Sequence, residues 1–469
     1  MKKKITEILS KKKFTLKDQS LFAVASGDKN PIHIDPIYAR KTISGECIVH
    51  GINIIMWAIN SLINKKKITP VIIKTSFFKP IFLNETIFCM WKKDLNQIDI
   101  VSNKILLTSI QVEIGKITKN KIINIKIGKK NKYPKKLKFS ESYFFKKKNI
   151  LFRGESKYLE KTYPELYKNY GKGTLCEFLT ISEIVGMEIP GLNSLFLGLN
   201  IVFKNNNCIP ILKITKIDSR FKILNILIKT PGLTSEIEAC FRPEVTQRSK
   251  IKIIKKLVRA NEFTKVRALI VGGSRGIGEI IAKLIAYGNG SVHITFAYNI
   301  DDAKKIKQTL KNCGKKITVS RLRIPKDSFN SINWYKFNQI YYCATPKIFA
   351  KRSFNFDRKL YKKFSEIYTI GFKKLIKSIP NKLIKNISVF YPSTKAIQEP
   401  TLELSEYIKT KKEGEILCKK INKKHKNFII YPRIPRIKTD QTISILKNTY
   451  QKNPEKLLLL LIRKITKKL

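Results

Sequence analysis

Residues 26–35 of the chain read S-G-D-K-N-P-I-H-I-D. A carboxylate, Asp28, and an imidazole, His33, stand on either side of Asn30-Pro31, and the proline stiffens the turn between them. A second histidine follows in Ile48-Val49-His50-Gly51, where an apolar, helix-like run begins. An acid and a base on a rigid loop can move protons on and off one water while a helix N-terminus holds an oxyanion.

The same stretch also has a purely structural interpretation. Asp-x-Asn-Pro can be a simple turn, because Asp and Asn side chains bond to nearby backbone and proline presets φ. A buried histidine such as His50 is more often a core residue than a catalyst, so we expect a structural role for it. For Asp28 and His33 together we expect catalysis. The backbone N–H of Gly51, at a helix start, is the kind of donor that an enolate-like oxygen needs.

The order of these residues resembles the MaoC-like (R)-specific enoyl thioester hydratases of the hot-dog fold. The resemblance extends to about residue 115 and includes the strand-like run from Phe77 to Ile87. It implies an α+β hot-dog domain over residues 1–128 that hydrates 2-enoyl thioesters. Asp28 and His33 would share one water, and the N–H of Gly51 would stabilise the developing enolate.

A second unit of similar order is predicted over residues 163–250, after a Lys-rich linker at 129–162. Helical apolar spacing from Thr174 to Val185 precedes several runs typical of strands, at 195–203, 211–217, 221–228 and 237–241. This unit contains neither histidine nor D-x-N-P-x-H. It resembles the degenerate half of a double hot-dog hydratase, which implies that it shapes the acyl tunnel.

The pattern changes to alternating strands and helices near residue 262. Val266–Glu279 reads V-R-A-L-I-V-G-G-S-R-G-I-G-E, an apolar strand, a glycine-rich turn and a helix start. Such a turn lets the backbone approach a pyrophosphate at a helix N-terminus. A strand at 292–297 and a helix at 301–310 complete the context of a Rossmann unit. The expected cofactor contacts are Gly272, Ser274, Arg275, Gly276, Ile277 and Gly278.

A later motif, Tyr407-Ile-Lys-Thr-Lys411, has the Y-x-x-x-K spacing that places both side chains on one helix face. Together with the glycine turn it resembles the short-chain dehydrogenases/reductases, which implies an α/β Rossmann domain over residues 262–469. The resemblance implies that Tyr407 is the acid/base, while Lys411 lowers its proton affinity and holds the ribose. Ser393 would hold the substrate oxygen, with Thr394 competing for that role.

Three positions depart from that family's pattern. Tyr368 stands where its proton relay usually has an asparagine, and Cys343-Ala344-Thr345 replaces an N-A-G turn. Tyr431–Arg436 (Y-P-R-I-P-R) stands where a Pro-Gly loop is common, and the substrate lid is short. These departures concern the proton relay and the enclosure of substrate.

The residues after the second strand indicate which cofactor is used. An NAD-binding strand usually ends in a carboxylate that bonds the adenosine ribose, but Phe296–Asn299 contains none, and Asp301 is the first acid. Arg275 could pair with a 2′-phosphate in a bidentate way; the alternative is a solvated arginine in a basic protein. We therefore expect NADP(H) in preference to NAD(H).

The composition excludes several classes of protein. The 94 Lys and Arg against 34 Asp and Glu give a charge of +60, but the lysines are spread along all 469 residues and form no nucleic-acid-binding motif. The eight cysteines have no metal-ligand spacing, so we expect no metal and buried thiols in a reducing cytoplasm. The basic start lacks the apolar core of a signal peptide, and Leu457–Ile462 is too short to span a membrane.

Three functions remain open. The first is a bifunctional enzyme that hydrates enoyl thioesters and interconverts (R)-3-hydroxyacyl and 3-oxoacyl thioesters with NADP(H). The second is a reductase whose hot-dog halves only bind the acyl chain, and the third is a non-catalytic binding protein for acyl thioesters or nucleotide. The expected partners are acyl-CoA or acyl-carrier-protein substrates, together with further copies of the chain.

Overall fold

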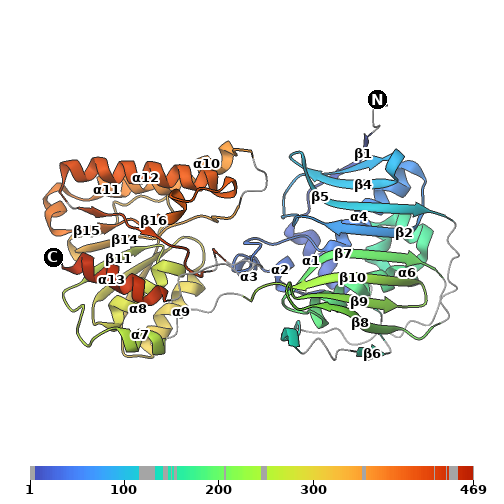
Figure 1. The fold of residues 1–469 in the computed structure, drawn as a ribbon, viewed down its shortest axis with the longest axis horizontal. Helices are drawn as coiled ribbons and strands as arrows, with labels where there is room; N and C mark the ends of the chain where they lie inside the picture. The colour runs from blue at the N-terminus through green and yellow to red at the C-terminus, as the bar shows by residue number, and fades with distance from the viewer. Residues whose placement is uncertain are drawn as a thin grey trace. The chain divides into compact units, whose positions relative to one another are not determined.

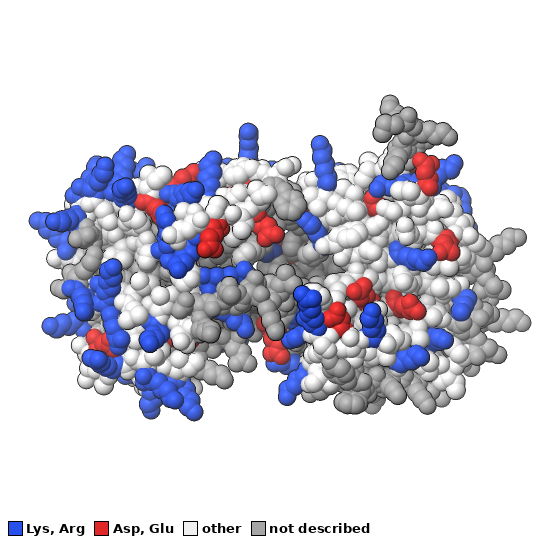
Figure 2. Space-filling model, in the orientation of Figure 1, with Lys and Arg blue, Asp and Glu red and all other residues white. Residues whose placement is uncertain are grey.

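The structure is a computed structural model with two compact units, residues 1–244 and 245–469 (Figure 1). It describes residues 6–115, 133–140, 146–148, 150, 152, 156–204, 208–244, 251–350, 355–426, 428–439, 441–442 and 453–467. The predicted boundaries at 128/129 and 250 lie outside these residues. On the face shown in Figure 2, Lys and Arg side chains are scattered over both units, with acidic side chains among them.

The first unit contains two halves, each with one long helix, shorter helices and several strands. The first half comprises β1 (Thr6–Lys12), α1 (Leu16–Ser26), α2 (Pro31–Ile34), α3 (Pro36–Ala39), α4 (Gly51–Lys66), β2 (Pro70–Phe77), β3 (Ile87–Lys92), β4 (Gln97–Ser102) and β5 (Ile105–Ile114). The second comprises β6 (Lys146–Lys148), α5 (Ser156–Thr162), α6 (Pro164–Glu183), a π-helical turn (Ile184–Glu188), β7 (Ser194–Phe203), β8 (Ile211–Asp218), β9 (Ile223–Lys229) and β10 (Leu233–Phe241).

Within the described residues of this unit, ten strands form one antiparallel sheet in the order β1-β3-β4-β5-β2-β7-β10-β9-β8-β6. The two halves have the same strand topology and meet where β2 pairs with β7, with Ile72 opposite Val202 and Ser76 opposite Gly198. In each half a long helix, α4 or α6, precedes the central strand, and the two helices pack together. They share one hydrophobic core with the sheet, so the two predicted hot-dog segments form a single packed unit.

The sequence explains these elements locally. Helix α1 begins at a capping box between Thr15 and Asp18, and ends where Gly27 adopts a left-handed conformation. Helix α4 is apolar nearly all round, which suits a helix buried between a sheet and another helix. In β3 the buried residues Ile87, Cys89 and Trp91 alternate with more exposed ones, as expected for a strand with one face on the core.

The second unit is a parallel α/β domain. Its sheet has the order β13-β12-β11-β14-β15-β17, in which every pairing is parallel, as in a Rossmann fold. Buried apolar clusters lie on both faces of this sheet. The sheet strands are β11 (Arg267–Val271), β12 (Ser291–Phe296), β13 (Ile317–Arg321), β14 (Gln339–Tyr342), β15 (Ser388–Phe390) and β17 (Ile429–Ile430); β16 (Ser393–Thr394) pairs with β18 (Arg433–Ile434). The helices are α7 (Ile251–Leu257), α8 (Gly276–Tyr287), α9 (Ile300–Lys311), α10 (Arg358–Ser365), a π-helical turn (Glu366–Gly371), α11 (Phe372–Ser378), α12 (Ser405–Lys424) and α13 (Pro454–Thr466).

Three predicted boundaries differ from the structure. Helix α5 lies inside the predicted linker and buries Leu159 against the core of the first unit. Helix α6 begins at Pro164, ten residues before the predicted start at Thr174. Helix α7 precedes the predicted start of the Rossmann domain at 262, and its Ile254 is buried in the core of the second unit. All three segments are rich in lysine or otherwise polar, so tertiary contacts decide where the units begin.

None of the helices in the described part of the chain combines the length and apolarity needed to cross a bilayer.

Candidate functional site

The loop that carries Asp28 is fixed at both ends. Gly27, with φ of 82°, ends α1, and Asn30 caps α2 by accepting a hydrogen bond from the N–H of Ile32 at 3.2 Å. The Asn30 amide also donates to the carbonyl oxygens of Gly186 (3.0 Å) and Gly191 (3.1 Å), in the second half of the unit. The Asn-Pro pair therefore does more than turn the chain, because it attaches the loop to the other half.

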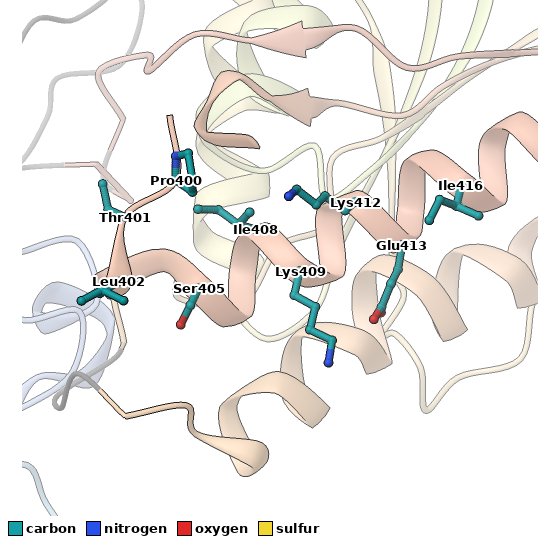
Figure 3. Close-up of a pocket in the computed structure, with 9 residues that line it drawn as sticks. All are labelled: Pro400, Thr401, Leu402, Ser405, Ile408, Lys409, Lys412, Glu413 and Ile416. Atoms are coloured by element: carbon teal, nitrogen blue, oxygen red, sulfur yellow. The ribbon is translucent and has the colours of Figure 1, made fainter. Parts of the chain in front are cut away.

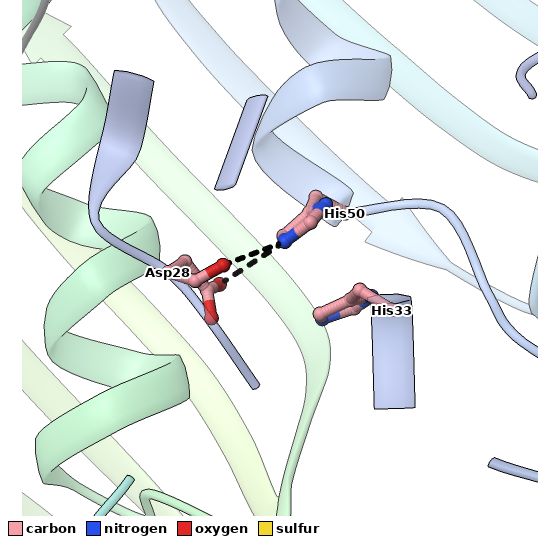
Figure 4. A group of neighbouring side chains, drawn as sticks. All are labelled: Asp28, His33 and His50. Carbon is pink, nitrogen blue, oxygen red and sulfur yellow. Dashed lines mark hydrogen bonds and ion pairs between the residues drawn. The ribbon is translucent and has the colours of Figure 1, made fainter. Parts of the chain in front are cut away.

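The two residues predicted to share one water lie together. Asp28, His33 and His50 form a group whose potential ligand atoms all lie within 4.8 Å of one another (Figure 4). The rings of His33 and His50 are stacked, with centroids 3.8 Å apart. His50 Nε2 lies 3.9 Å from Asp28 Oδ2. The structure thus brings Asp28 and His33 together and adds His50 to the group.

The hydrogen bonds of His33 define its protonation. Its Nδ1 lies 2.8 Å from the carbonyl oxygen of Ile48, which can only accept, so Nδ1 carries the hydrogen. Burial lowers the pKa of His33 to about 4, and the positive charge of Arg242 contributes in the same direction. The ring is therefore neutral near pH 7, and Nε2 is left with a lone pair that can take a proton.

The pKa of Asp28 is shifted in the opposite direction to that of His33. Its side chain is 2% exposed and accepts hydrogen bonds from Ser182 Oγ at 2.7 Å and from the N–H of Asn30 at 3.2 Å. Burial raises the pKa of Asp28 to about 7, although both hydrogen bonds act to lower it. The carboxyl group can therefore hold a proton at a pH where His33 does not.

His50 is fully buried, in agreement with the structural interpretation of this residue. Gln19 Oε1 accepts hydrogen bonds from the backbone N–H of His50 (3.0 Å) and from its Nδ1 (2.7 Å). Nε2 lies 3.1 Å from the backbone oxygen of Asp28. Both ring nitrogens thus lie within hydrogen-bond distance of carbonyl oxygens, which fixes the orientation of the His50 ring.

Gly51 is the first residue of α4, directly after His50. A first-turn N–H has no partner within its own helix, which is the property expected of an oxyanion donor. A Cβ at this position would lie 3.1 Å from Cζ of Phe77. The structure therefore provides a reason for glycine here that is independent of chemistry.

Arg242 directly follows β10 and is 2% exposed. Its Nη2 donates to the hydroxyl of Tyr38 at 3.2 Å and to the carbonyl oxygen of Leu192. Its Nε and Nη1 have no hydrogen-bond partner in the described part of the chain. The positive charge of Arg242 adds to the larger effect of burial in lowering the pKa of His33.

In the second unit, the glycine turn joins β11 to α8 as predicted. Gly272 and Gly276 have φ of 78° and 58°, conformations that favour glycine. A Cβ on Gly278 would lie 2.5 Å from the carbonyl oxygen of Gly272, so the helix approaches the turn closely. Arg275 occupies the N-cap position of α8, but its side chain makes no capping hydrogen bond to the helix. The backbone N–H groups of the first turn can therefore donate hydrogen bonds to a phosphate. Ser274 and Ile277 lie in the same turn and first helical turn.

Tyr407 and Lys411 lie on the buried face of α12 and are 9% and 4% exposed. The hydroxyl that contacts the Tyr407 phenol belongs to Thr394. Ser393, predicted as the first choice, is 3% exposed and donates to Glu415 instead. Because successive residues of a strand point to opposite sides, only one of the two hydroxyls can face Tyr407.

The effect of Lys411 on Tyr407 stays a prediction, because burial is the largest influence on the pKa of this phenol. Burial raises the pKa of Tyr407 to about 12, and lowers the pKa of Lys411 to about 7. Lys411 Nζ donates to the carbonyl oxygen of Pro392 at 2.8 Å and lies 3.9 Å from the ring centroid of Tyr368. Its distance from the centroid of the Tyr407 ring is 5.9 Å.

Two of the departures from the reductase pattern contact each other. Tyr368 lies in the π-helical turn, and its phenol oxygen is 2.5 Å from Oγ1 of Thr345 in the Cys343-Ala344-Thr345 segment. In the third departure, the segment Tyr431–Arg436, Arg433 Nη2 donates to Glu415 at 2.7 Å. The carboxylate of Glu415 also accepts a hydrogen bond from Ser393.

A groove of about 510 Å³ lies on the outer face of α12 (Figure 3). Leu402 and Ile416, which line it, are 65% and 67% exposed, whereas Tyr407 and Lys411 are buried on the other side of the helix. The groove is therefore separate from Tyr407 and Lys411.

One comparison with known protein families matches the part of the chain that contains Asp28 and His33. Residues 5–113 match the family described as MaoC like domain. The MaoC-like segment contains Asp28, His33 and Gly51, and ends before the second half of the unit. A search of curated proteins found no match.

Several solved structures are similar to part of this chain. An alcohol dehydrogenase from the archaeon Thermococcus sibiricus, complexed with 5-hydroxy-NADP, is 17% identical, with a TM-score of 0.36, over 43% of this chain and 89% of its own. A 3-oxoacyl (acyl-carrier-protein) reductase from Agrobacterium tumefaciens with NADP bound is 16% identical, with a TM-score of 0.35, over 39% and 76%. A short-chain dehydrogenase from Escherichia coli complexed with NADPH is 12% identical, with a TM-score of 0.35, over 39% and 81%.

Sequence reasoning missed three residues around the MaoC-like site. Gln19 lies on α1, Ser182 on α6 and Arg242 after β10, and each contacts or influences Asp28, His33 or His50. None belongs to a motif. Only the folding of the second half against the first brings Ser182 and Arg242 to the loop.

Proposed function

We propose that the chain is a bifunctional acyl-thioester enzyme of the cytoplasm. The first unit, a double hot-dog, hydrates 2-enoyl thioesters to (R)-3-hydroxyacyl thioesters, and reverses that reaction. The second interconverts the 3-hydroxyacyl and 3-oxoacyl thioesters with NADP(H). The observation that carries the proposal is that Asp28 and His33 lie close together, with the pKa of Asp28 raised to about 7 and that of His33 lowered to about 4.

In the hydration direction, His33 Nε2 takes a proton from water while the water oxygen bonds to the β-carbon. The protonated carboxyl of Asp28 delivers its proton to the α-carbon, so one water is added in total. The proton that His33 has taken then passes to the Asp28 carboxylate, which restores both groups for the next turnover. The N–H of Gly51 stabilises the oxygen of the developing enolate. The pKa directions support this division of roles, because near neutral pH His33 is neutral and Asp28 retains much of its proton.

In the second unit, Tyr407 exchanges a proton with the substrate oxygen, and Thr394 holds that oxygen by a hydrogen bond. The nicotinamide cofactor supplies or accepts the hydride when it is bound. Gly272, Gly276 and Gly278 let its pyrophosphate reach the N-terminus of α8, and the close packing at Gly278 fits that role. Lys411, beside Tyr407 on α12, would hold the ribose.

The preference for NADP(H) rests on two features. Arg275 stands at the turn where a 2′-phosphate would lie, and β12 ends at Phe296 without a carboxylate that would repel one. Asn299 is used as the N-cap of α9, where it bonds the N–H of Asp301 at 2.8 Å.

The proposal is tested with crotonyl-CoA, followed by NADP⁺ in the same cuvette. Loss of the enoyl absorbance followed by formation of NADPH is expected. Asp28→Asn and His33→Ala should each lower hydration about a hundred- to ten-thousand-fold and leave NADPH binding unchanged. Unchanged hydration in both variants would contradict the assignment. Hydration without NADPH would limit the second unit to binding, while NADPH formation from 3-hydroxybutyryl-CoA alone would leave a reductase whose first unit only binds acyl chains.

A further inference from the structure

The half of the first unit that lacks the D-x-N-P-x-H motif lies directly against Asp28. Ser182, in the last turn of α6, is 1% exposed, and its Oγ donates to Asp28 Oδ2 at 2.7 Å. Gly186 follows in the π-helical turn Ile184–Glu188. A Cβ on Gly186 would lie 2.1 Å from Asp28 Oδ1 and 2.5 Å from its Cγ, which is closer than non-bonded heavy atoms of this kind approach each other. This half therefore determines where the carboxyl group can be.

The hydrogen bonds leave the carboxyl group little freedom to rotate. Ser182 bonds one oxygen, and the N–H of Asn30 bonds the other at 3.2 Å. The Asn30 side chain in turn donates to the carbonyl oxygen of Gly186 at 3.0 Å. The loop from the first half and the turn from the second thus hold each other, with the carboxyl group between them.

We propose that Ser182 and Gly186 are positioning residues of the hydration site: Ser182 holds the Asp28 carboxyl group for proton transfer to the α-carbon, and Gly186 leaves the space it occupies. This inference rests on the proposed hydration activity. It assigns to the half without the motif a direct part in the chemistry of the other half, beyond shaping the acyl tunnel. Proton delivery requires a fixed direction, because misplacement by a fraction of an ångström already lowers the rate.

The hydroxyl of Ser182 also acts on the charge of Asp28. Its hydrogen bond lowers the pKa of Asp28, whereas burial and the nearby Glu183 raise it. The other titratable groups that face this carboxyl group are His50, at 3.9 Å, and His33 in the same cluster. Removal of the Ser182 hydroxyl therefore raises the pKa of Asp28 further, and the pH at which hydration declines should move upward.

The first test compares Ser182→Ala with Ser182→Thr by the pH profile of crotonyl-CoA hydration. A hydrogen bond to an ionisable group contributes about 1.5–3 kcal/mol, which corresponds to a loss of about ten- to a hundredfold in kcat. We expect that loss in Ser182→Ala, with KM within about twofold of the wild type and the basic limb at higher pH, and recovery in Ser182→Thr. Thr180→Val is the control, because the Thr180 hydroxyl, on the same helix, donates to the carbonyl oxygen of Cys176 at 2.7 Å.

The second test is Gly186→Ala, which should lower hydration by at least about a hundredfold, because its methyl group displaces the carboxyl group. Gly198→Ala on β7 is the control, since a Cβ there would meet the nearest atom, the carbonyl oxygen of Thr75, at 3.4 Å. Thermal unfolding of each variant separates misplacement of Asp28 from failure to fold. If Gly186→Ala does not fold, Ser182→Ala still tests the proposal.

The two levels of the proposal fail in different ways. If the wild type hydrates crotonyl-CoA and both Ser182→Ala and Gly186→Ala behave like it at every pH, the inference is overturned and the hydratase assignment stands. If the wild type hydrates neither crotonyl-CoA nor crotonyl-acyl-carrier protein, the proposed function fails. In that case the infrared carboxyl stretch of Asp28, which is assigned by its loss in Asp28→Asn, is followed as a function of pH. If Ser182→Ala leaves the pKa of Asp28 unchanged, the inference is overturned. An upward shift of this pKa in Ser182→Ala supports the hydrogen bond from Ser182 to Asp28.

Discussion

The phenol oxygen of Tyr368 lies 2.5 Å from Oγ1 of Thr345. These residues occupy two separate positions at which the sequence departs from the reductase pattern, and the fold makes them partners. The Tyr368 ring also lies 3.9 Å from Nζ of Lys411, which gives the ammonium group an aromatic neighbour in a buried position. The two departures therefore form one local arrangement around Lys411.

This arrangement predicts different effects for two substitutions of Tyr368. Tyr368→Phe keeps the ring against Lys411 and removes only the hydroxyl, so we expect a loss of about 1 kcal/mol in stability and reductase activity within about tenfold. Tyr368→Ala removes a fully packed ring and should cost about 3–5 kcal/mol. Urea unfolding and 3-oxoacyl thioester reduction measure both effects; equal effects of the two substitutions would show that the ring is unimportant.

A matched pair of hydroxyls tests the proposed reductase site. Thr394 contacts the Tyr407 phenol, whereas Ser393 donates to Glu415, so Thr394→Ala should lower kcat for reduction about a hundredfold. Ser393→Ala should lower it by less than about threefold. Steady-state kinetics with NADPH decide between them. A larger loss in Ser393→Ala would restore the assignment predicted from the sequence.

The pH dependence of hydration follows from the two pKa shifts. The proposed hydration requires protonated Asp28, which is lost as the pH rises through about 7, and neutral His33, which is lost as the pH falls through about 4. The rate should therefore be highest between these values and decline on both sides. Initial rates across this range with a crotonyl thioester provide the measurement, and a rate that rises above pH 7 would exchange the roles of acid and base.

Arg242 should control the acid limb of that profile. Its charge lowers the pKa of His33, so Arg242→Met should raise that pKa and move the acid limb to higher pH. Arg220, which is exposed and bonds Asp218 through its backbone, provides the control as Arg220→Met. An unchanged acid limb in Arg242→Met would assign the limb to a group other than His33.

Cofactor choice is tested at the glycine turn. Arg275→Ala should weaken NADPH binding at least about tenfold and leave NADH binding within about twofold, because only NADPH carries the 2′-phosphate. Gly278→Ala should weaken both, since its methyl group would meet the carbonyl oxygen of Gly272. Fluorescence titration measures both affinities, and crotonyl thioester hydration by the first unit serves as an internal control. Equal loss of NADH and NADPH in Arg275→Ala would contradict a role in selecting the cofactor.

The sequence alone predicted the elements that local patterns specify. The glycine turn, the Y-x-x-x-K helix and the D-x-N-P-x-H loop each depend on backbone conformations or spacings within a few residues, and the structure contains all three. The sequence also predicted that Asp28 and His33 would lie close together, because a short, proline-stiffened loop leaves few alternatives.

Long-range packing decided the remainder. The sequence could not reveal that Ser182 and Gly186 meet Asp28, because no local pattern connects residues separated by more than 150 positions. Nor could it choose between Ser393 and Thr394, since that depends on which side of a strand faces α12. Motifs fix which residues can do chemistry, whereas burial, which raises the pKa of Asp28 and lowers that of His33, exists only once both halves have folded together.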